Sequence, residues 1–89
     1  MTDFELFKTR YNYDPNTGAF TSRLNGRVAG YQRQAGYVLL RKNGKAAPVY
    51  AHRVAWLLTY GEWPPAEIDH INGVRNDNRI ANLRLVTRQ

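Results

Sequence analysis

The sequence contains no cysteine, and this absence excludes disulfide bonds and zinc sites held by thiolates. Because there are only two histidines, a structural zinc site would also need carboxylate ligands, and it stays a distant alternative. No apolar run approaches the roughly 20 residues of a membrane-spanning helix, and the first residues lack the basic and apolar regions of a secretory signal. We therefore expect a cytoplasmic protein that does not cross a membrane.

Acidic residues are also missing from the middle of the chain, since none occurs between Pro15 and Gly61. Seven of the 13 basic residues fall in that segment, and the 89-residue chain has a formal net charge of +6. Ten of the basic residues are arginine, whose planar guanidinium can grip a phosphate with two hydrogen bonds. A segregated basic surface favours a nucleic-acid partner over a merely soluble basic domain or a membrane-surface role.

The N-terminal part of the chain predicts a short helix and then a β-hairpin. Residues 2–10 have a possible N-cap in Thr2 or Asp3, with acidic residues first and basic residues last, as helices prefer. Residues 11–22 alternate around a turn rich in Asp, Pro, Asn and Gly, which is typical of a hairpin. Residues 23–35 have no clear period, and we expect a basic loop or an irregular strand pair there.

A second hairpin is predicted in the middle of the sequence. Residues 36–41 are rich in aliphatic and aromatic side chains and form the best strand of the chain. The following Asn43-Gly44 step is the one that two-residue hairpin turns prefer. We expect the return strand at residues 46–50 to lie at a sheet edge, because Pro48 cannot donate a hydrogen bond to a neighbouring strand.

Residues 51–60 predict the central helix of the core, since their apolar side chains recur at helical spacing and Gly61 stands at the position of a C-terminal cap. His52 and Arg53 fall in its first turn, where cations are unfavourable unless an anion such as phosphate lies nearby. The alternative for His52 is a helix-entry residue bonded to the backbone, so its role stays open.

The last quarter of the sequence predicts two strands around a polar loop. Residues 67–71 and 83–87 are the expected strands, and the loop at residues 72–82 should contain one helical turn capped by Asp77 or Asn78. The whole pattern predicts an α+β fold of small antiparallel β-hairpins packed on a central helix.

An Asp-His pair at the end of the first of these strands carries the candidate chemistry. Imidazole beside carboxylate can supply a general base and a ligand for a hard cation in one place. Consecutive residues of a regular strand point to opposite faces, so Asp69 and His70 can share a site only if the strand ends or bulges there. The alternative is a polar loop whose side chains satisfy their own backbone.

Several short motifs accompany the pair, in the order Ile68-Asp69-His70-Ile71-Asn72-Gly73, Asp77-Asn78-Arg79, Asn82-Leu83-Arg84 and Val86-Thr87-Arg88. Together with residues 13–20 and 51–61, they resemble the HNH endonuclease family, in its branch associated with phages and introns. The resemblance covers most of the chain. It implies that residues 1–89 form a single HNH-nuclease-like domain, with an N-terminal helix and hairpins (1–50), a core helix (51–61) and the ββ part of the HNH motif (67–89). It also implies that the protein acts in a bacterial or phage-infected host cell.

The resemblance also implies a ββα-metal site in which a two-stranded hairpin and a helix hold one divalent cation, Mg²⁺ or Mn²⁺. His70 would be the general base that activates water, Asp69 a metal ligand, and Asn82 a brace that keeps the imidazole oriented. The implied activity is a metal-dependent DNA endonuclease or nickase. Imidazole is largely neutral at physiological pH and can take the proton of water, while a cation stabilises the charge on the phosphate.

Arginines are the candidates for phosphate contacts, which give affinity and salt dependence rather than sequence specificity. We expect those around the Asp-His pair first and two more distant ones second: Arg75, Arg79, Arg84 and Arg88, then Arg53 and Arg41. A solvated strand or loop position is the alternative for each of them.

The sequence departs from the family at its C-terminal end. The third motif residue of the family, an Asn or His metal ligand, lies on a helix that would begin near Gln89. The resemblance therefore implies an incomplete ββα unit, so that either the sequence is a fragment or a protein partner or second copy supplies the helix. The competing function is a non-catalytic HNH remnant that binds nucleic acid, or that binds a nucleic-acid-processing enzyme as an inhibitor or adaptor.

Overall fold

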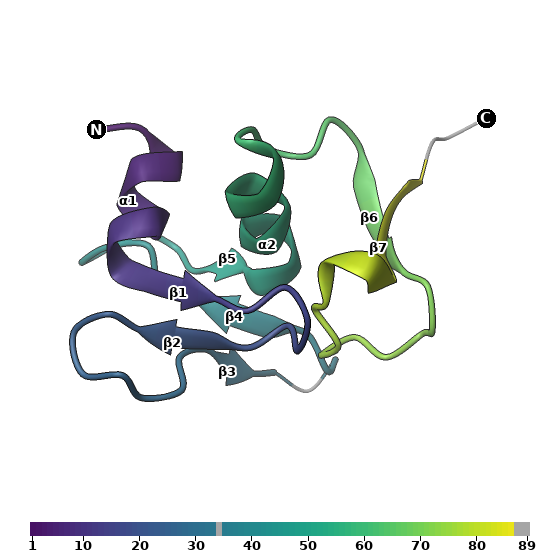
Figure 1. The fold of residues 1–89 in the computed structure, drawn as a ribbon, viewed down its shortest axis with the longest axis horizontal. Coiled ribbons are helices and arrows are strands. Elements are labelled where there is room, and N and C mark those ends of the chain that lie inside the picture. The colour runs from purple at the N-terminus through teal and green to yellow at the C-terminus, as the bar shows by residue number, and fades with distance from the viewer. Residues whose placement is uncertain (34, 87–89) are drawn as a thin grey trace.

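The computed structural model describes residues 1–33 and 35–86 of the chain (Figure 1). The helical elements are α1 (Asp3–Arg10), α2 (Ala51–Tyr60) and a 3₁₀ turn, η1 (Ile80–Asn82). The strands pair antiparallel in three small sheets: β1 (Tyr11–Tyr13) with β2 (Phe20–Ser22); β3 (Tyr31–Gln32), β4 (Val38–Leu40) and β5 (Val49–Tyr50), in that order; and β6 (Glu67–His70) with β7 (Leu83–Val86). The predicted α+β fold class is confirmed.

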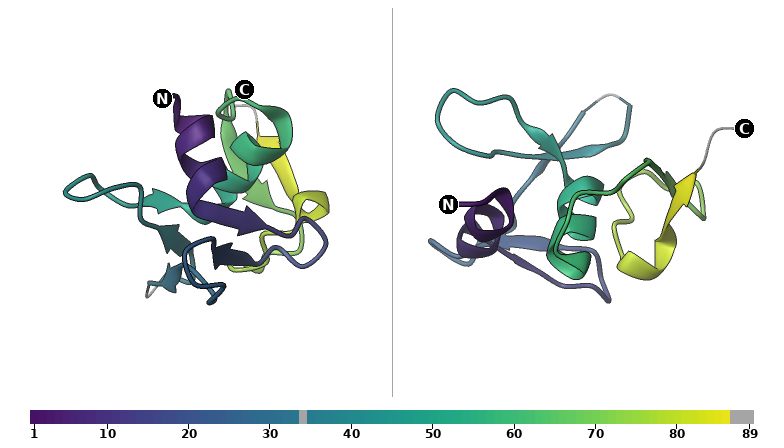
Figure 2. Two further views of the ribbon diagram at one scale, coloured as in Figure 1. Left: turned by 60° about the vertical axis from the view of Figure 1, so that its left-hand side comes forward. Right: turned by 90° about the horizontal axis from the view of Figure 1, so that it is seen from above.

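Helix α2 is the central element, with α1 on one side and the β6–β7 hairpin on the other (Figures 1 and 2). Helix α1 and one strand of each sheet bury a large side chain in the core that α2 completes: Phe7, Phe20, Leu40 and Leu83. The helix ends as predicted at Gly61, whose φ of 81° is left-handed and whose N–H donates to the Leu57 oxygen at 2.8 Å. Hairpins too small to be stable alone thus share one core.

The N-terminal predictions agree with the structure. The Thr2 hydroxyl caps α1 by accepting a hydrogen bond from the Glu5 N–H at 3.2 Å. The first hairpin forms, with Tyr13 opposite Phe20 at the end of its register. The basic segment after it contains the short strand β3 and an isolated bridge between Thr21 and Val28.

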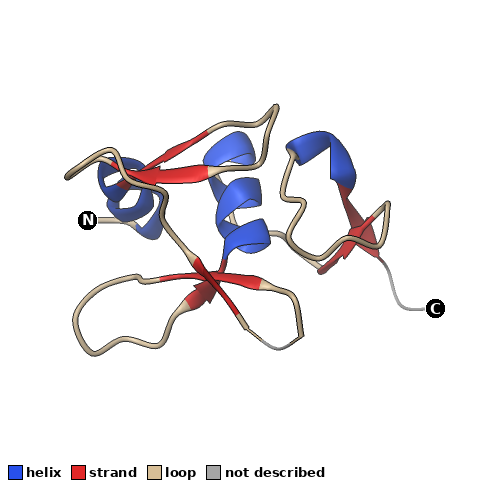
Figure 3. Cartoon of the chain, turned by 90° about the horizontal axis from the view of Figure 1, so that it is seen from below, coloured by secondary structure: helices blue, strands red, loops and turns tan. Residues whose placement is uncertain are grey.

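The predicted two-residue turn between β4 and β5 is wrong. Residues 41–48 form a wider connection, which projects from the three-stranded sheet in Figure 3, and a turn in it is closed by the Ala46 N–H donating to the Asn43 oxygen at 3.0 Å. A type I′ turn needs positive φ at both central residues, and no described residue other than glycine has one. Pro48 offers no N–H with which to extend the ladder toward the turn. The predicted edge position of β5 is correct.

The C-terminal hairpin also differs in detail. Strand β6 ends at His70, one residue earlier than predicted, and its residues Asp69 and His70 face Arg84 and Leu83 across the ladder. The predicted helical turn exists as η1, but the predicted caps are wrong. Arg79 is the N-cap residue, without a side-chain cap, because the neighbouring polar side chains make other contacts. In the described part of the chain, no helix has the length and apolar character that crossing a membrane requires.

Candidate active site

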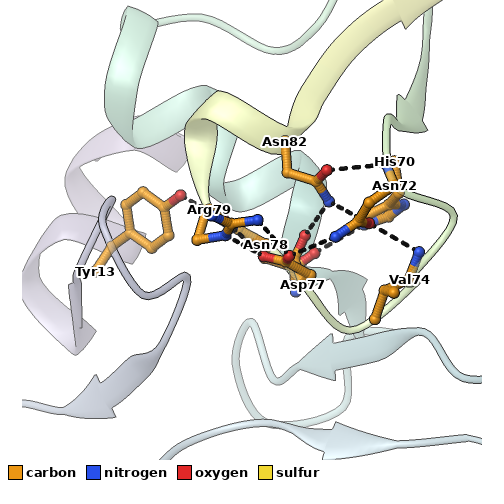
Figure 4. Close-up of polar contacts among 8 residues, drawn as sticks. All are labelled: Tyr13, His70, Asn72, Val74, Asp77, Asn78, Arg79 and Asn82. Atoms are coloured by element: carbon orange, nitrogen blue, oxygen red, sulfur yellow. Dashed lines mark hydrogen bonds and ion pairs between the residues drawn. The ribbon is translucent and has the colours of Figure 1, made fainter.

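A hydrogen-bond network centred on Asn82 fixes the loop between β6 and β7 (Figure 4). The side-chain amide of Asn82 donates to Asn72 Oδ1 and to the backbone oxygen of Asp77, both at 2.9 Å. Its Oδ1 accepts from the Asn72 N–H at 3.0 Å, and its backbone oxygen accepts from the Ile71 N–H at 2.8 Å. These contacts brace the loop, and the predicted role of Asn82 in orienting the imidazole for catalysis stays a prediction.

Asn78 holds the imidazole of His70 at the end of β6. The Nε2 atom of His70 lies 2.9 Å from Asn78 Oδ1, and both side chains are buried. Because a carboxamide oxygen can only accept, the hydrogen lies on Nε2 and the lone pair of the neutral ring on Nδ1. Asn78 is fixed in turn, since its backbone oxygen accepts a hydrogen bond from the Tyr13 hydroxyl. Burial raises the pKa of Tyr13, so this hydroxyl keeps its proton.

The contact between Asn78 and His70 was not predicted from the sequence, where Asn78 was one of two candidate caps for a helical turn. The position of Asn78 inside the Asp77-Asn78-Arg79 motif was the signal that could have found it. Its partner could not be read from the sequence, since the loop must first fold back on the strand.

Asp69 forms an ion pair with its cross-strand neighbour Arg84. The Oδ2 atom of Asp69 accepts from Arg84 Nε at 3.0 Å and lies 2.9 Å from Nη2. Both side chains are substantially exposed, at 43% for Asp69 and 61% for Arg84. The pair therefore occupies the outward face of the hairpin, whereas His70 and Leu83, the next pair of the ladder, are buried.

One cavity of about 230 Å³ is nevertheless lined by both Asp69 and His70. Strand β6 keeps a regular register up to His70 and then ends, and the chain turns back at Gly73, whose N–H donates to the His70 oxygen at 2.8 Å. The end of the strand, rather than a bulge, thus lets consecutive residues border one space. The rest of the lining comes from Tyr37, Ile68, Gly73 and Arg75.

Two imidazoles and two phenol rings cluster beside this cavity. The ring centroid of His52 lies 5.0 Å from that of His70 and 5.3 Å from that of Tyr50. Tyr37 lies 6.1 Å from His70 by the same measure. Among the described residues, His52 Nδ1 is the one buried side-chain nitrogen or oxygen without a hydrogen-bond partner. Burial above all, and then the electrostatic effects of His70 and Arg53, lower the pKa of His52 from 6.5 to about 4.

Three of the first-choice arginines are held by partners within the protein. Besides the Arg84 pair, Arg75 Nη1 donates to the Ala35 oxygen at 2.7 Å, and its guanidinium lies 5.0 Å from the centroid of Tyr37. Arg79 grips both carboxylate oxygens of Asp77 at 2.8 Å, and these hydrogen bonds hold the pKa of Asp77 well below its ordinary value. These side chains shape the loop, and phosphate contacts would compete with their present partners.

Within the described part of the chain, the guanidinium groups of the two second-choice arginines are free. In residues 1–33 and 35–86, neither Arg41 nor Arg53 has a hydrogen-bonding or acidic partner for its side chain. Arg53 lies in the first turn of α2 next to His52. Arg88 lies outside the described residues. The arginines that the sequence favoured for phosphate contacts are therefore not the ones most available to make them.

The residues present suit a weakly held hard cation rather than a preformed cage. No group of three or more His, Cys, Asp or Glu side chains comes together in the described parts of the chain. Mg²⁺ is often bound by one or two carboxylates together with waters and substrate phosphates, and Asp69 can supply such a carboxylate. In the structure its Oδ2 is engaged by Arg84, so the arginine and a cation would compete for Asp69.

Residues 49–89 match the family model described as HNH endonuclease. The match covers α2, the Asp-His pair, the braced loop and β7, and it confirms the resemblance to the HNH family that the motifs predicted. It indicates a nuclease-type function in general, and acting on nucleic acid is a property of that family. No curated protein and no solved structure gave a significant match.

Proposed function

We propose that the protein is an HNH-type DNA endonuclease or nickase that depends on a divalent cation, with His70 as the general base. The observation that carries the proposal is the cavity bordered by both Asp69 and His70, next to an imidazole whose Nε2 is fixed by Asn78. In this proposal residues 1–89 act as one domain, and the braced loop keeps the site in place.

The hydrogen bond to Asn78 gives His70 the tautomer that a base requires. With the hydrogen on Nε2, Nδ1 has the lone pair that takes the proton of the attacking water. Asn82 acts through the loop, because its bonds to Asn72 and Asp77 fix the segment that contains Asn78. Fixing the ring in advance removes reorganisation from the chemical step.

Asp69 would hold the cation, Mg²⁺ or Mn²⁺, with water and the scissile phosphate completing its ligands. When bound, the cation stabilises the developing charge on the phosphate and on the leaving oxygen. The outward position of Asp69 leaves it accessible for this, and freeing Oδ2 requires Arg84 to move or share. We propose that the displaced Arg84 guanidinium then contacts DNA phosphate.

Two observations favour the second candidate function, a non-catalytic HNH remnant that binds nucleic acid or a nucleic-acid-processing enzyme. The Asp69–Arg84 ion pair already neutralises the proposed ligand, and His70 is only 6% exposed. A protein locked in this arrangement would keep its basic surface without its chemistry.

A plasmid-nicking assay separates the two functions. Wild-type protein with Mg²⁺ or Mn²⁺ should convert supercoiled plasmid to the nicked form, and EDTA or Asp69→Asn should abolish the conversion. DNA binding is measured in parallel by electrophoretic mobility shift. Binding without metal-dependent nicking would reject the nuclease and support the remnant.

A further inference from the structure

The first turn of α2 places the guanidinium of Arg53 at a helix N-terminus. No side chain caps the helix at Tyr50, and the first turn contains no acidic residue. It contains His52 and Arg53 instead, at the end where the unpaired N–H groups and the helix dipole already favour negative charge. This arrangement is unfavourable for the protein alone and favourable once an anion is bound.

A groove of about 550 Å³ opens at this helix end. Tyr37, Tyr50, His52 and Arg53 line it, together with Glu67 and Ile68. Two of its lining residues, Tyr37 and Ile68, also line the cavity of the Asp-His pair, so the two spaces are neighbours. A strand of DNA that occupies the cavity can therefore continue into the groove.

His52 is a second and independent indication of a ligand at the groove. Its side chain is 8% exposed, and Nδ1 is buried without a hydrogen-bond partner. Nε2 has no hydrogen bond in the described structure and is not among the buried unpaired atoms, so Nε2 is the nitrogen that reaches the groove. A buried N–H without an acceptor is costly, so the neutral ring of His52 places its hydrogen on the accessible Nε2 rather than on the buried Nδ1. Nε2–H is therefore a hydrogen-bond donor that the protein itself does not use.

We propose that this groove is a phosphate subsite, in which the guanidinium of Arg53 and the Nε2–H of His52 bind the phosphodiester next to the scissile one on the same strand. The exposed ring of Tyr50, stacked on His52, packs against the sugar of that nucleotide. The position of the phosphate relative to the cut rests on the proposed nuclease function. The anion-binding property of the groove does not.

The test measures the coupling between Arg53 and single phosphates. Fluorescence anisotropy gives the affinity of a short labelled duplex in EDTA, where no cleavage occurs, and each phosphate in turn is replaced by a neutral methylphosphonate. One replacement, adjacent to the mapped cleavage position, should weaken wild-type binding about three- to tenfold. Arg53→Gln should bind natural DNA equally weakly, lose nothing further from that replacement, and lower the salt slope by about 1.

Arg27→Gln is the matched control, because Arg27 lies on an exposed loop that does not line the groove. The loss of DNA-binding free energy in Arg27→Gln should simply add to the loss caused by the methylphosphonate replacement. His52→Gln keeps a side-chain N–H donor and should retain the sensitivity to that phosphate, whereas His52→Leu should lose it. Circular dichroism checks that the variants are folded.

The outcomes separate this inference from the proposed function. A coupled phosphate found without any DNA cleavage would uphold the subsite and reject the nuclease. Additive losses for Arg53→Gln at every phosphate, or unchanged affinity in this variant, would overturn the subsite even if wild-type protein cleaves DNA.

Discussion

Nε2 of His70 and Oδ1 of Asn78 lie 2.9 Å apart, and this bond joins the last residue of β6 to a loop residue eight positions further along the chain. Asn78 is 2% exposed, so water does not compete for the bond. The orientation of the candidate base therefore depends on a loop whose shape is set by Asn82 on one side and Tyr13 on the other.

Removing the carboxamide of Asn78 should impair catalysis more than DNA binding. We expect Asn78→Ala to lower kcat about 10- to 100-fold with little change in KM, because nothing then fixes the tautomer and the orientation of the His70 imidazole. Asn78→Asp retains an acceptor oxygen and should keep more activity than the alanine variant. Single-turnover cleavage rates check this, and an unchanged kcat in Asn78→Ala would contradict the role assigned to the bond.

Gly18 packs against the backbone of the loop between β6 and β7, and its replacement should disturb that loop. Its φ is +78°, and a Cβ there would come within 2.5 Å of Arg79 N. Gly18→Ala should therefore cost about 2–4 kcal/mol from backbone strain and overpacking. Gly26→Ala is the control: its φ is +71° with nothing within 4 Å of the Cβ, so it should cost only about 1 kcal/mol. Urea denaturation measures both, and equal costs would argue against the close packing.

Arg84 should weaken the binding of a cation at Asp69. Arg84→Gln removes a positive charge that engages the Asp69 carboxylate, so Mn²⁺ affinity should rise about two- to fivefold, as expected for an exposed pair. The free Mn²⁺ signal in electron paramagnetic resonance reports binding without any need for cleavage. Arg27→Gln serves as the remote control, and equal Mn²⁺ affinity in both variants would exclude competition at Asp69.

Acid should destabilise the fold through His52. Its pKa is lowered to about 4 by burial, so between pH 6.5 and 4 the unfolded chain binds a proton that the folded chain does not. Stability should therefore fall as the pH falls through this window, by at most about 3 kcal/mol. Urea denaturation at pH 7 and pH 4.5 measures the effect, and His52→Gln should flatten it. The pKa of Asp77 is lowered in the folded protein, so Asp77 reduces the stability only when the pH falls below about 3.8, its ordinary pKa. An equally steep pH dependence in His52→Gln would assign the effect to other groups.

Local sequence signals predicted the elements well, and long-range contacts account for what was missed. Helix α2 and its Gly61 cap follow from spacing and from glycine's access to left-handed φ, which are properties of the segment itself. The 41–48 connection differs from the predicted tight turn because Pro48 limits the pairing of β5.

Side-chain partners in the site were harder to predict, because they come from separate segments. The Asp69–Arg84 pair depends on the register of two strands, and the Arg75–Ala35 contact spans 40 positions of the chain. From the sequence, the arginines could be ranked only by their distance from Asp69 and His70 along the chain. Availability depends instead on which carboxylates and carbonyls the fold has already placed beside them.

The most direct measurement of the central claim is chemical rescue of His70→Ala. We expect this variant to bind DNA normally and to nick plasmid about 10²- to 10⁴-fold more slowly than wild type in Mg²⁺ or Mn²⁺, as for loss of a general base. Added imidazole should restore part of the rate in His70→Ala and leave the wild-type rate unchanged. Equal nicking rates for the two proteins, without added imidazole, would contradict the assignment of His70 as the base.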